Sequence, residues 1–279
     1  MPDLVARDGT RLAYHVVGDG RPVICLAGGP MLDSAYLGDL GGLSRRRQLV
    51  LVDYRGTGSS QTPRDLTSCR CDRLTDDVEA LRDHLGLDRV DLLAHSAGAN
   101  VAAAYATRRP ERVGKVVMVT PSVIGVGITP TSETRREVVL RREAEPWFGP
   151  AREAFEAVTA GRATPEDWLG IAPLTYGRWD GAARAHHSDM EQRRRPQVAA
   201  AFGADGAFDP EATRAGLAAF DGPVLVLAGA VDVSAPPAVV AEFAALWRDA
   251  TLVTQEGAGH FPWLDDPARF TKVVGSYLG

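Results

Sequence analysis

Residues 92–100 read LLAHSAGAN and hold a serine, Ser96, between an apolar run and a run of small residues. The mostly apolar residues 90–94 are typical of a buried strand, and residues 97–108, most of them small, are typical of a helix that ends before a proline. A serine in such a strand-to-helix turn lies at the tip of a sharp bend, where its hydroxyl is accessible. The stretch therefore predicts a strand, a tight turn that presents Ser96 and a helix; the alternative is a serine that only caps the helix.

Small residues flank the serine where the strand and the helix must cross closely. They are Ala94, two residues before Ser96, and Gly98, two residues after it. The usual pattern in such turns is Gly-x-Ser-x-Gly. Ala94 departs from it by one methyl group, which we expect the crossing to accept. His95, on the strand side of the turn, is predicted to point away from the serine and to serve in packing.

An aspartate and a histidine follow Ser96 in the order that serine-based acyl transfer uses on one type of α/β sheet. Asp232 comes just past the apolar run 224–229, and His260 lies in the sequence GAGHFP. A serine hydroxyl needs a base to take its proton and a carboxylate to orient that base. We therefore predict that Ser96 is a nucleophile, His260 its base and Asp232 the orienting acid. Asp221 is the alternative acid, but it precedes the strand and falls at the opposite edge of the sheet.

Two glycines and a proline follow another apolar run at the same expected edge. Residues 28–30 read GGP directly after the strand predicted for residues 22–27. Glycine lets the backbone approach a reacting carbonyl closely enough for an N–H group to stabilise developing negative charge. We predict that the N–H groups of Gly29 and of Ala97, the residue after the serine, form an oxyanion hole. The alternative is a plain turn.

Apolar runs alternate with helical patterns along most of the chain, which predicts a mostly parallel sheet flanked by helices. Strands are predicted at residues 4–7, 11–17, 22–27, 48–53, 89–94, 113–120, 223–228 and 250–254, and helices at residues 34–43, 74–85 and 97–108. After Pro121 the alternation stops, and the chain is rich in arginine and glutamate. We therefore predict a core of residues 1–120 and 210–279 and a helical cap of residues 121–209, which would roof a pocket at the carboxyl edge of the sheet.

Five segments, taken in order along the chain, resemble the proline iminopeptidase branch of the α/β-hydrolase superfamily. They are GGP at residues 28–30, DYRGTGSS at residues 53–60, the Ser96 turn, Asp232 and the pair Gly259 and His260. The resemblance implies an α/β-hydrolase fold with an inserted helical cap, and cleavage of an amide or ester bond through an acyl-enzyme. In the second segment we expect Arg55 to donate hydrogen bonds to loop carbonyls and to brace the oxyanion loop.

Two residues depart from the family's pattern His-Gly-Gly-Pro-Gly, because Ala27 replaces the histidine and Met31 replaces the last glycine. The oxyanion role is unaffected, since it belongs to the backbone. Proline iminopeptidases also hold the free amine of the substrate with carboxylates of the cap. Glu191 and Asp189 fall near that place, but the tryptophans expected beside it are absent. The alternative is that both carboxylates are solvated.

The predicted lining of the pocket is mostly apolar. The candidates are Met31 of the core and three cap tryptophans, Trp147, Trp168 and Trp179, because an apolar roof over polar catalytic groups is usual in such sites. Glu191 is the candidate group for binding a substrate amine.

No metal site and no cofactor are predicted. Cys69 and Cys71 lack the second pair of ligands that a zinc site needs, and Cys25 fits a core strand. His186 and His187 are adjacent, so on a helix they would point about 100° apart and would not share one ion. We predict surface positions for both.

The length and the composition fit a cytosolic globular enzyme. The chain has 279 residues, 45% of them hydrophobic, and a formal net charge of −5. This mild acidity gives no reason to expect nucleic acid or an anionic membrane as a partner. The first residues, MPDLVARD, lack a signal-peptide core, and no apolar stretch has the length of a membrane span, so we expect a cytoplasmic location. The oligomeric state is left open.

These observations predict a serine hydrolase that cleaves an amide or ester bond of a small molecule, as a proline iminopeptidase does. A carboxylesterase or thioesterase is the first alternative, since these enzymes share the same three groups. A non-catalytic binding protein on the same scaffold is the second. The complete set of three groups favours catalysis, because a protein that only binds has no need of it.

Overall fold

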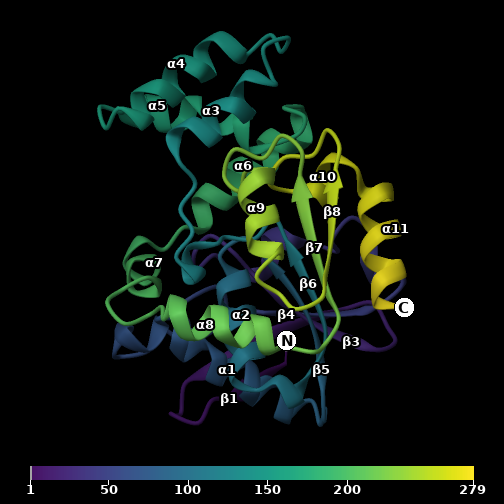
Figure 1. The fold of residues 1–279 in the computed structure, drawn as a ribbon. Coiled ribbons are helices and arrows are strands. Elements are labelled where there is room, and N and C mark those ends of the chain that lie inside the picture. Colours follow the sequence, from purple (N-terminus) through teal and green to yellow (C-terminus); the bar gives the residue numbers. More distant parts are fainter. Residues whose placement is uncertain (1) are drawn as a thin grey trace.

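The computed structural model describes residues 2–279, and a single sheet runs through its centre (Figure 1). Among these residues, eight strands pair in the order β1-β2-β4-β3-β5-β6-β7-β8. The strands are β1 (Asp3–Val5), β2 (Arg11–Val17), β3 (Pro22–Leu26), β4 (Gln48–Val52), β5 (Val90–His95), β6 (Val113–Val119), β7 (Val224–Gly229) and β8 (Ala250–Gln255). In this described sheet β2 pairs antiparallel with both β1 and β4, and every other pair of neighbouring strands is parallel. The prediction of a mostly parallel sheet flanked by helices is confirmed.

Helices cover both faces of the sheet, which explains the apolar runs. Every residue of β5 and β7 is buried, as expected for central parallel strands with both faces covered. The core helices are α1 (Cys71–His84), α2 (Gly98–Arg108), α8 (Pro210–Ala219), α9 (Pro237–Ala244), α10 (Pro262–Asp265) and α11 (Pro267–Leu278). Helix α2 packs between α1 and α8. In Figure 1, α8 and α9 lie to the left of β7 and β8, and α11 lies to their right.

The segment 34–43, predicted as one helix, forms two short 3₁₀ turns instead, at Ser34–Leu37 and Leu43–Arg45. Gly38 and Gly41 adopt φ angles of 55° and 66°, in the left-handed region that a right-handed helix excludes. The glycines therefore end the first turn and redirect the chain before it enters β4.

Between β6 and β7 the chain forms a group of helices over the carboxyl ends of the strands. They are α3 (Ser132–Leu140), α4 (Phe148–Thr159), α5 (Pro165–Gly170), α6 (Gly181–Arg193) and α7 (Pro196–Phe202). In Figure 1, α3, α4 and α5 lie above the arrowheads of β7 and β8. We call residues 121–209 the cap; its boundaries stay a prediction. A small hydrophobic cluster that includes Val139 and Phe155 joins α3 to α4.

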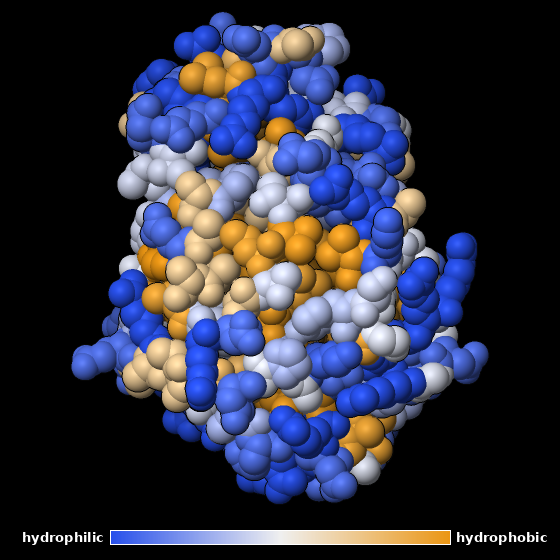
Figure 2. Space-filling model, turned by 45° about the vertical axis from the view of Figure 1, so that its right-hand side comes forward, coloured by the Kyte–Doolittle hydropathy of each residue, from blue (hydrophilic) through white to orange (hydrophobic). Residues whose placement is uncertain are grey.

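On the face that Figure 2 shows, the surface of the cap is mostly hydrophilic. Figure 2 turns the right-hand side of Figure 1 forward, and it shows a band of hydrophobic residues across the middle of this face, between the hydrophilic cap and the hydrophilic lower part. Leu252 of the edge strand β8 is one of the large hydrophobic residues that are exposed, with 40% of its surface accessible. Within residues 2–279, no helix combines the length and the apolar character that crossing a bilayer requires.

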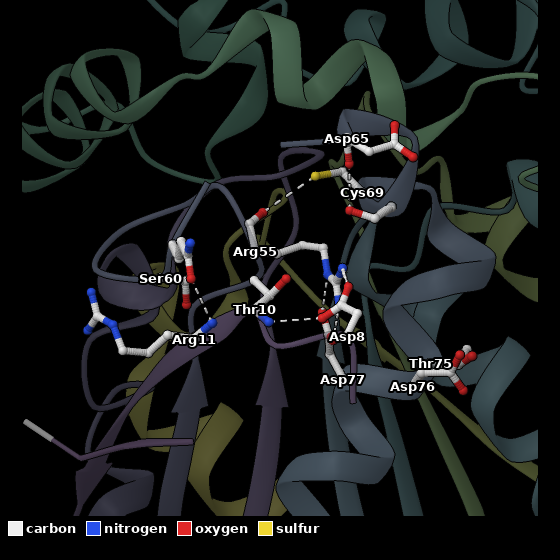
Figure 3. Close-up of polar contacts among 12 residues, drawn as sticks. Asp8, Thr10, Arg11, Arg55, Ser60, Asp65, Cys69, Thr75, Asp76 and Asp77 are labelled. Atoms are coloured by element: carbon white, nitrogen blue, oxygen red, sulfur yellow. Dashed lines mark hydrogen bonds and ion pairs between the residues drawn. The ribbon is translucent and has the colours of Figure 1, made fainter. Parts of the chain in front are cut away.

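The loop that follows β4 is tied to three other parts of the core. The Arg55 guanidinium donates to Asp77 of α1 at 2.8 Å and to Asp8 of the N-terminal hairpin at 2.6 Å (Figure 3). Asp53 accepts from both the N–H and the hydroxyl of Ser34, at 2.9 and 2.7 Å. Arg55 therefore binds carboxylates rather than the loop carbonyls we expected, because its guanidinium points toward α1, and it is Asp53 that holds the segment after the GGP turn.

Candidate active site

Ser96 lies in a strained turn between β5 and α2. Its φ of 51° is rare for a residue with a side chain. The close crossing leaves no room for larger residues, because a Cβ on Gly98 would lie 2.6 Å from the Ala27 carbonyl oxygen. A Cβ on Gly28 would lie 2.8 Å from the Ser96 Cβ. The glycines of two segments distant in sequence thus bring β3 and its following turn against the serine.

His260 bridges Ser96 and Asp232. Its Nε2 lies 2.9 Å from the Ser96 hydroxyl, and its Nδ1 lies 2.7 Å from an oxygen of Asp232. Asp232 is fully buried, and its other oxygen accepts from the N–H groups of Ser234 and Ala235 at 2.8 and 3.0 Å. A carboxylate only accepts hydrogen bonds, so it fixes the proton on Nδ1 and leaves Nε2 to accept from the serine. The structure thus brings together the three residues named from the sequence.

Tyr36 and His95 form a second network behind these groups. The Gly28 N–H donates to the Tyr36 oxygen at 2.7 Å, and the Tyr36 hydroxyl donates to His95 Nδ1 at 2.7 Å. His95 Nε2 donates to the backbone carbonyl of His260 at 2.9 Å, which also accepts from the Thr120 hydroxyl at 2.9 Å. The network therefore connects the turn after β3 with the backbone of the histidine.

Burial keeps this network neutral. It lowers the pKa of His95 well below its usual range, and the adjacent His260 lowers it further. Burial also raises the pKa of Tyr36. A neutral His95 holds one proton, on Nε2, so each donor in the chain of bonds meets one acceptor. His95 does more than the packing predicted for it, and Tyr36 was missed because 59 residues separate the two partners.

Replacing Tyr36 by Phe is expected to lower the free energy of unfolding by about 1–3 kcal/mol, because it leaves the buried Gly28 N–H and His95 Nδ1 without partners. Urea unfolding at equilibrium measures the change. Tyr54→Phe is the matched control, since Tyr54 is also buried but its hydroxyl has no hydrogen-bond partner among the described residues. A loss no larger for Tyr36→Phe than for Tyr54→Phe would contradict the network.

Two backbone N–H groups lie beside the serine. Gly29 and Ala97 line the same cavity as Ser96, and in residues 2–279 neither of their N–H groups has a protein acceptor. Gly29 has a φ of 120°, and a Cβ there would lie 2.7 Å from the Leu32 nitrogen. The backbone conformation at this position therefore requires glycine.

Two cavities meet at Ser96. The first has a volume of about 440 Å³ and the second about 760 Å³. Both are lined by Gly29, Ser96, Ser234 and His260. The first is otherwise largely apolar, with walls that include Val123, Ile128, Phe202 and Phe208. A substrate whose reacting carbonyl lies at Ser96 can therefore extend in two directions, one into each cavity.

The residues predicted to line the pocket divide into two groups. Trp168 and Glu191 line the second cavity. Trp147, Trp179 and Met31 line neither cavity, so for these three the structure differs from the prediction.

Packing partners explain where these three side chains lie. The Arg142 guanidinium lies 4.7 Å from the centre of the Trp147 ring, and Trp147 packs on the cluster between α3 and α4. Trp179 lies against Tyr176, with ring centres 5.4 Å apart. Met31 is almost fully buried in the core.

The charged cap residues named from the sequence are paired. Glu191 accepts from Arg194 at 2.7 Å, and Asp189 accepts from Arg193 at 2.7 Å. A substrate amine would have to compete with these guanidinium groups.

His186 connects the cap to the core. One ring nitrogen lies 2.9 Å from the Tyr176 hydroxyl, and the other lies 3.1 Å from the Tyr36 carbonyl oxygen. The predicted surface position of His186 is therefore wrong, because its ring packs between two tyrosines of distant segments. Among the described residues, no three His, Cys, Asp or Glu side chains are grouped so that they could hold a metal ion.

Comparison with known proteins agrees with this architecture. The family model described as the alpha/beta hydrolase fold matches residues 21–267. A putative carbamate hydrolase RutD from Caulobacter sp. (strain K31) is 30% identical over 276 residues, which cover 95% of each chain. A proline iminopeptidase from Heyndrickxia coagulans is 39% identical over 104 residues, which are 37% of this chain and 36% of that protein. The match to AB hydrolase superfamily protein YclE from Bacillus subtilis likewise spans 38% of that protein.

Solved structures with low sequence identity share the fold. A proline iminopeptidase from Mycobacterium smegmatis superimposes with a TM-score of 0.75 at 22% identity, over 99% of this chain and 97% of that one. The esterase EaEST from Exiguobacterium antarcticum has a TM-score of 0.75 at 20% identity, over 99% and 98%. The family match over most of the chain, and the relative that aligns along nearly its whole length, show that this chain belongs to the α/β-hydrolase family.

Proposed function

We propose that this hydrolase cleaves a carboxylic ester or amide bond of a small molecule through an acyl-enzyme on Ser96. The observation that carries the proposal is the continuous set of hydrogen bonds from Asp232 through His260 to Ser96, at the meeting point of two cavities. A protein that only binds a ligand has no need of this arrangement.

In the proposed reaction the Ser96 oxygen attacks the substrate carbonyl while its proton moves to His260 Nε2. Asp232 accepts from Nδ1–H and stabilises the imidazolium that forms. The negative charge on the carbonyl oxygen is met by the N–H groups of Gly29 and Ala97. His260 then gives its proton to the leaving alcohol or amine, and water, deprotonated by the same nitrogen, releases the acid and restores Ser96.

The pairing of the cap carboxylates favours ester substrates. Glu191 and Asp189 are held by Arg194 and Arg193, so neither presents a free carboxylate for a substrate amine. An aminopeptidase is the second candidate. One observation supports it, namely that Glu191 lines the same cavity as Ser96, and the partial similarity to a proline iminopeptidase points the same way.

Hydrolysis of matched chromogenic substrates tests the proposal. We expect turnover of 4-nitrophenyl esters with short acyl chains, and we expect a fluorophosphonate probe to label the protein at Ser96. Prolyl and alanyl 4-nitroanilides serve as the amine-bearing substrates. If no ester or anilide is cleaved and the probe does not react, the proposal is wrong and the binding-protein alternative stands.

Glu191→Gln separates the two candidate activities. For an aminopeptidase we expect KM for amine-bearing anilides to rise about tenfold with little change in kcat, because a uniform binding contact is lost. KM for uncharged esters should stay within about twofold in either case. Glu156→Gln is the control, since Glu156 also pairs with an arginine of the cap, Arg136, but lines neither cavity. Anilide cleavage that is insensitive to Glu191→Gln would rule out Glu191 as the amine anchor.

A further inference from the structure

The two cavities that meet at Ser96 differ in their charged lining. In the second cavity Glu191 and Arg194 form an ion pair, so their charges balance. In the first cavity, within the described part of the chain, the lining includes one guanidinium, that of Arg135 on α3, and no aspartate or glutamate. The first cavity therefore presents a positive charge among apolar walls.

Arg135 makes few contacts of its own. The single hydrogen bond of its side chain within residues 2–279 is from Nη1 to the Val233 carbonyl oxygen at 3.2 Å, and no carboxylate there lies within ion-pair distance. The next residue on the same helix, Arg136, pairs with both Glu133 and Glu156 at 2.8 Å. A guanidinium has five N–H donors, so most of those on Arg135 are free to bind a ligand.

The carboxylate whose charge acts on Arg135 has hydrogen-bond partners of its own. Asp232 accepts from His260 at one oxygen and from the N–H groups of Ser234 and Ala235 at the other. Burial lowers the pKa of Arg135, and the negative charge of Asp232 offsets only part of that lowering. Arginine nevertheless stays protonated at neutral pH. Asp232 thus helps to keep a charged guanidinium in a partly buried place without forming an ion pair with it.

We infer that Arg135 binds an anionic oxygen group of the substrate, such as a carboxylate, in the first cavity. The inference rests on the proposed function and names its substrate class: esters that carry a negative charge a short distance from the bond that is cleaved. A planar guanidinium binds a carboxylate through two parallel hydrogen bonds, which are stronger than bonds between neutral groups. The apolar walls would enclose the chain between the carboxylate and the reacting carbonyl.

Matched pairs of charged and neutral substrates test the inference. The first pair is the mono-4-nitrophenyl ester of adipic acid and the same compound with its free carboxyl methylated, which places the charge on the acyl side. The second pair is the butyrate ester of 4-hydroxybenzoate and that of methyl 4-hydroxybenzoate, which places the charge on the leaving side. We expect the charged ester of one pair to have a higher kcat/KM than its neutral partner. The pair that shows this difference tells whether the acyl side or the leaving side of the substrate lies against Arg135.

Three variants assign the preference to the residue. Arg135→Gln should lower kcat/KM for the preferred charged ester about 10- to 100-fold, mainly through KM, and change the neutral ester about twofold at most. Arg135→Lys should keep part of the preference, since it keeps the charge. Arg141→Gln is the control. Arg141, the residue directly after α3, also donates to the loop after β7, at the Ala230 carbonyl 2.9 Å away, but it lines neither cavity.

Some outcomes would overturn the inference. One is a wild-type protein that hydrolyses neutral esters as fast as charged ones in both pairs. Another is an Arg135→Gln protein that loses activity on both members equally, as expected if Arg135 only supports Val233. Binding of the four esters to the Ser96→Ala protein, measured by calorimetry with and without Arg135→Gln, tests charge recognition independently of turnover. If the esters bind tightly and in a charge-dependent way but the wild type hydrolyses none of them, the proposed function is wrong. The inference that Arg135 binds an anionic group would then still stand.

Discussion

Ser96→Ala is expected to lower kcat for ester hydrolysis about 10⁴-fold or more while the protein stays folded, because the three groups act as a unit. Without the hydroxyl, His260 has no nucleophile to deprotonate, and only the cavities and the two backbone N–H groups remain. Stopped-flow or steady-state release of 4-nitrophenolate gives the rate, and urea unfolding checks the fold. Fluorophosphonate labelling should disappear in the variant.

Ser122→Ala is the matched control, since Ser122 lines the first cavity as Ser96 does and its N–H donates to the Ser96 carbonyl. We expect this variant to retain labelling and most of its activity. If Ser96→Ala keeps near-normal rates, or if the probe reacts at another residue, Ser96 is not the nucleophile.

Asp232→Asn is expected to lower kcat by about 10⁴-fold with little change in KM. The carboxylate only accepts, so it holds the proton of His260 on Nδ1 and leaves Nε2 free to take the serine proton. An amide can donate to Nδ1, which favours the opposite tautomer and places the imidazole proton on Nε2. It also removes the negative charge that stabilises the imidazolium. Rates measured with one 4-nitrophenyl ester across several concentrations separate kcat from KM.

Asp221→Asn is the control for this change. Asp221 is exposed and precedes β7, whereas Asp232 follows β7 and is fully buried. We expect Asp221→Asn to behave like the wild type. A steep loss from Asp221→Asn with none from Asp232→Asn would exchange the roles of the two acids.

Much of the fold was predictable because its signals are local. Central parallel strands are covered on both faces, so β7 appears in the sequence as an unbroken apolar run, and β5 as a mostly apolar one that Asp91 interrupts. The turn at Ser96 needs a small residue where the strand and the helix cross. Gly98, only two residues after Ser96 in the sequence, is that residue. The helix predicted for residues 34–43 is wrong, because the glycines of this segment take left-handed conformations that a helix excludes.

Local sequence signals do not predict which side chains of the cap line the cavities. Trp147, Trp168 and Trp179 were equal candidates in the sequence, yet only Trp168 lines a cavity at Ser96. The Trp147 ring instead packs against the Arg142 guanidinium, which lies over its face. Which face of a cap helix points toward the serine depends on partners from other helices, and the spacing along one helix does not encode them.

The sequence alone determined three features of this protein: the order of Ser96, Asp232 and His260, the turn that presents the serine, and the alternation of strands and helices. Each of them depends on neighbours in sequence or on chain order. The Tyr36–His95 network could not be taken from the sequence, nor could the guanidinium of Arg135, which has no ion-pair partner in the part of the chain that the structure describes. Hydrogen bonds and ion pairs extend only a few ångströms, so whether two groups meet depends on how distant segments pack. For this protein that packing determines which groups surround the reacting bond, and hence which substrates fit.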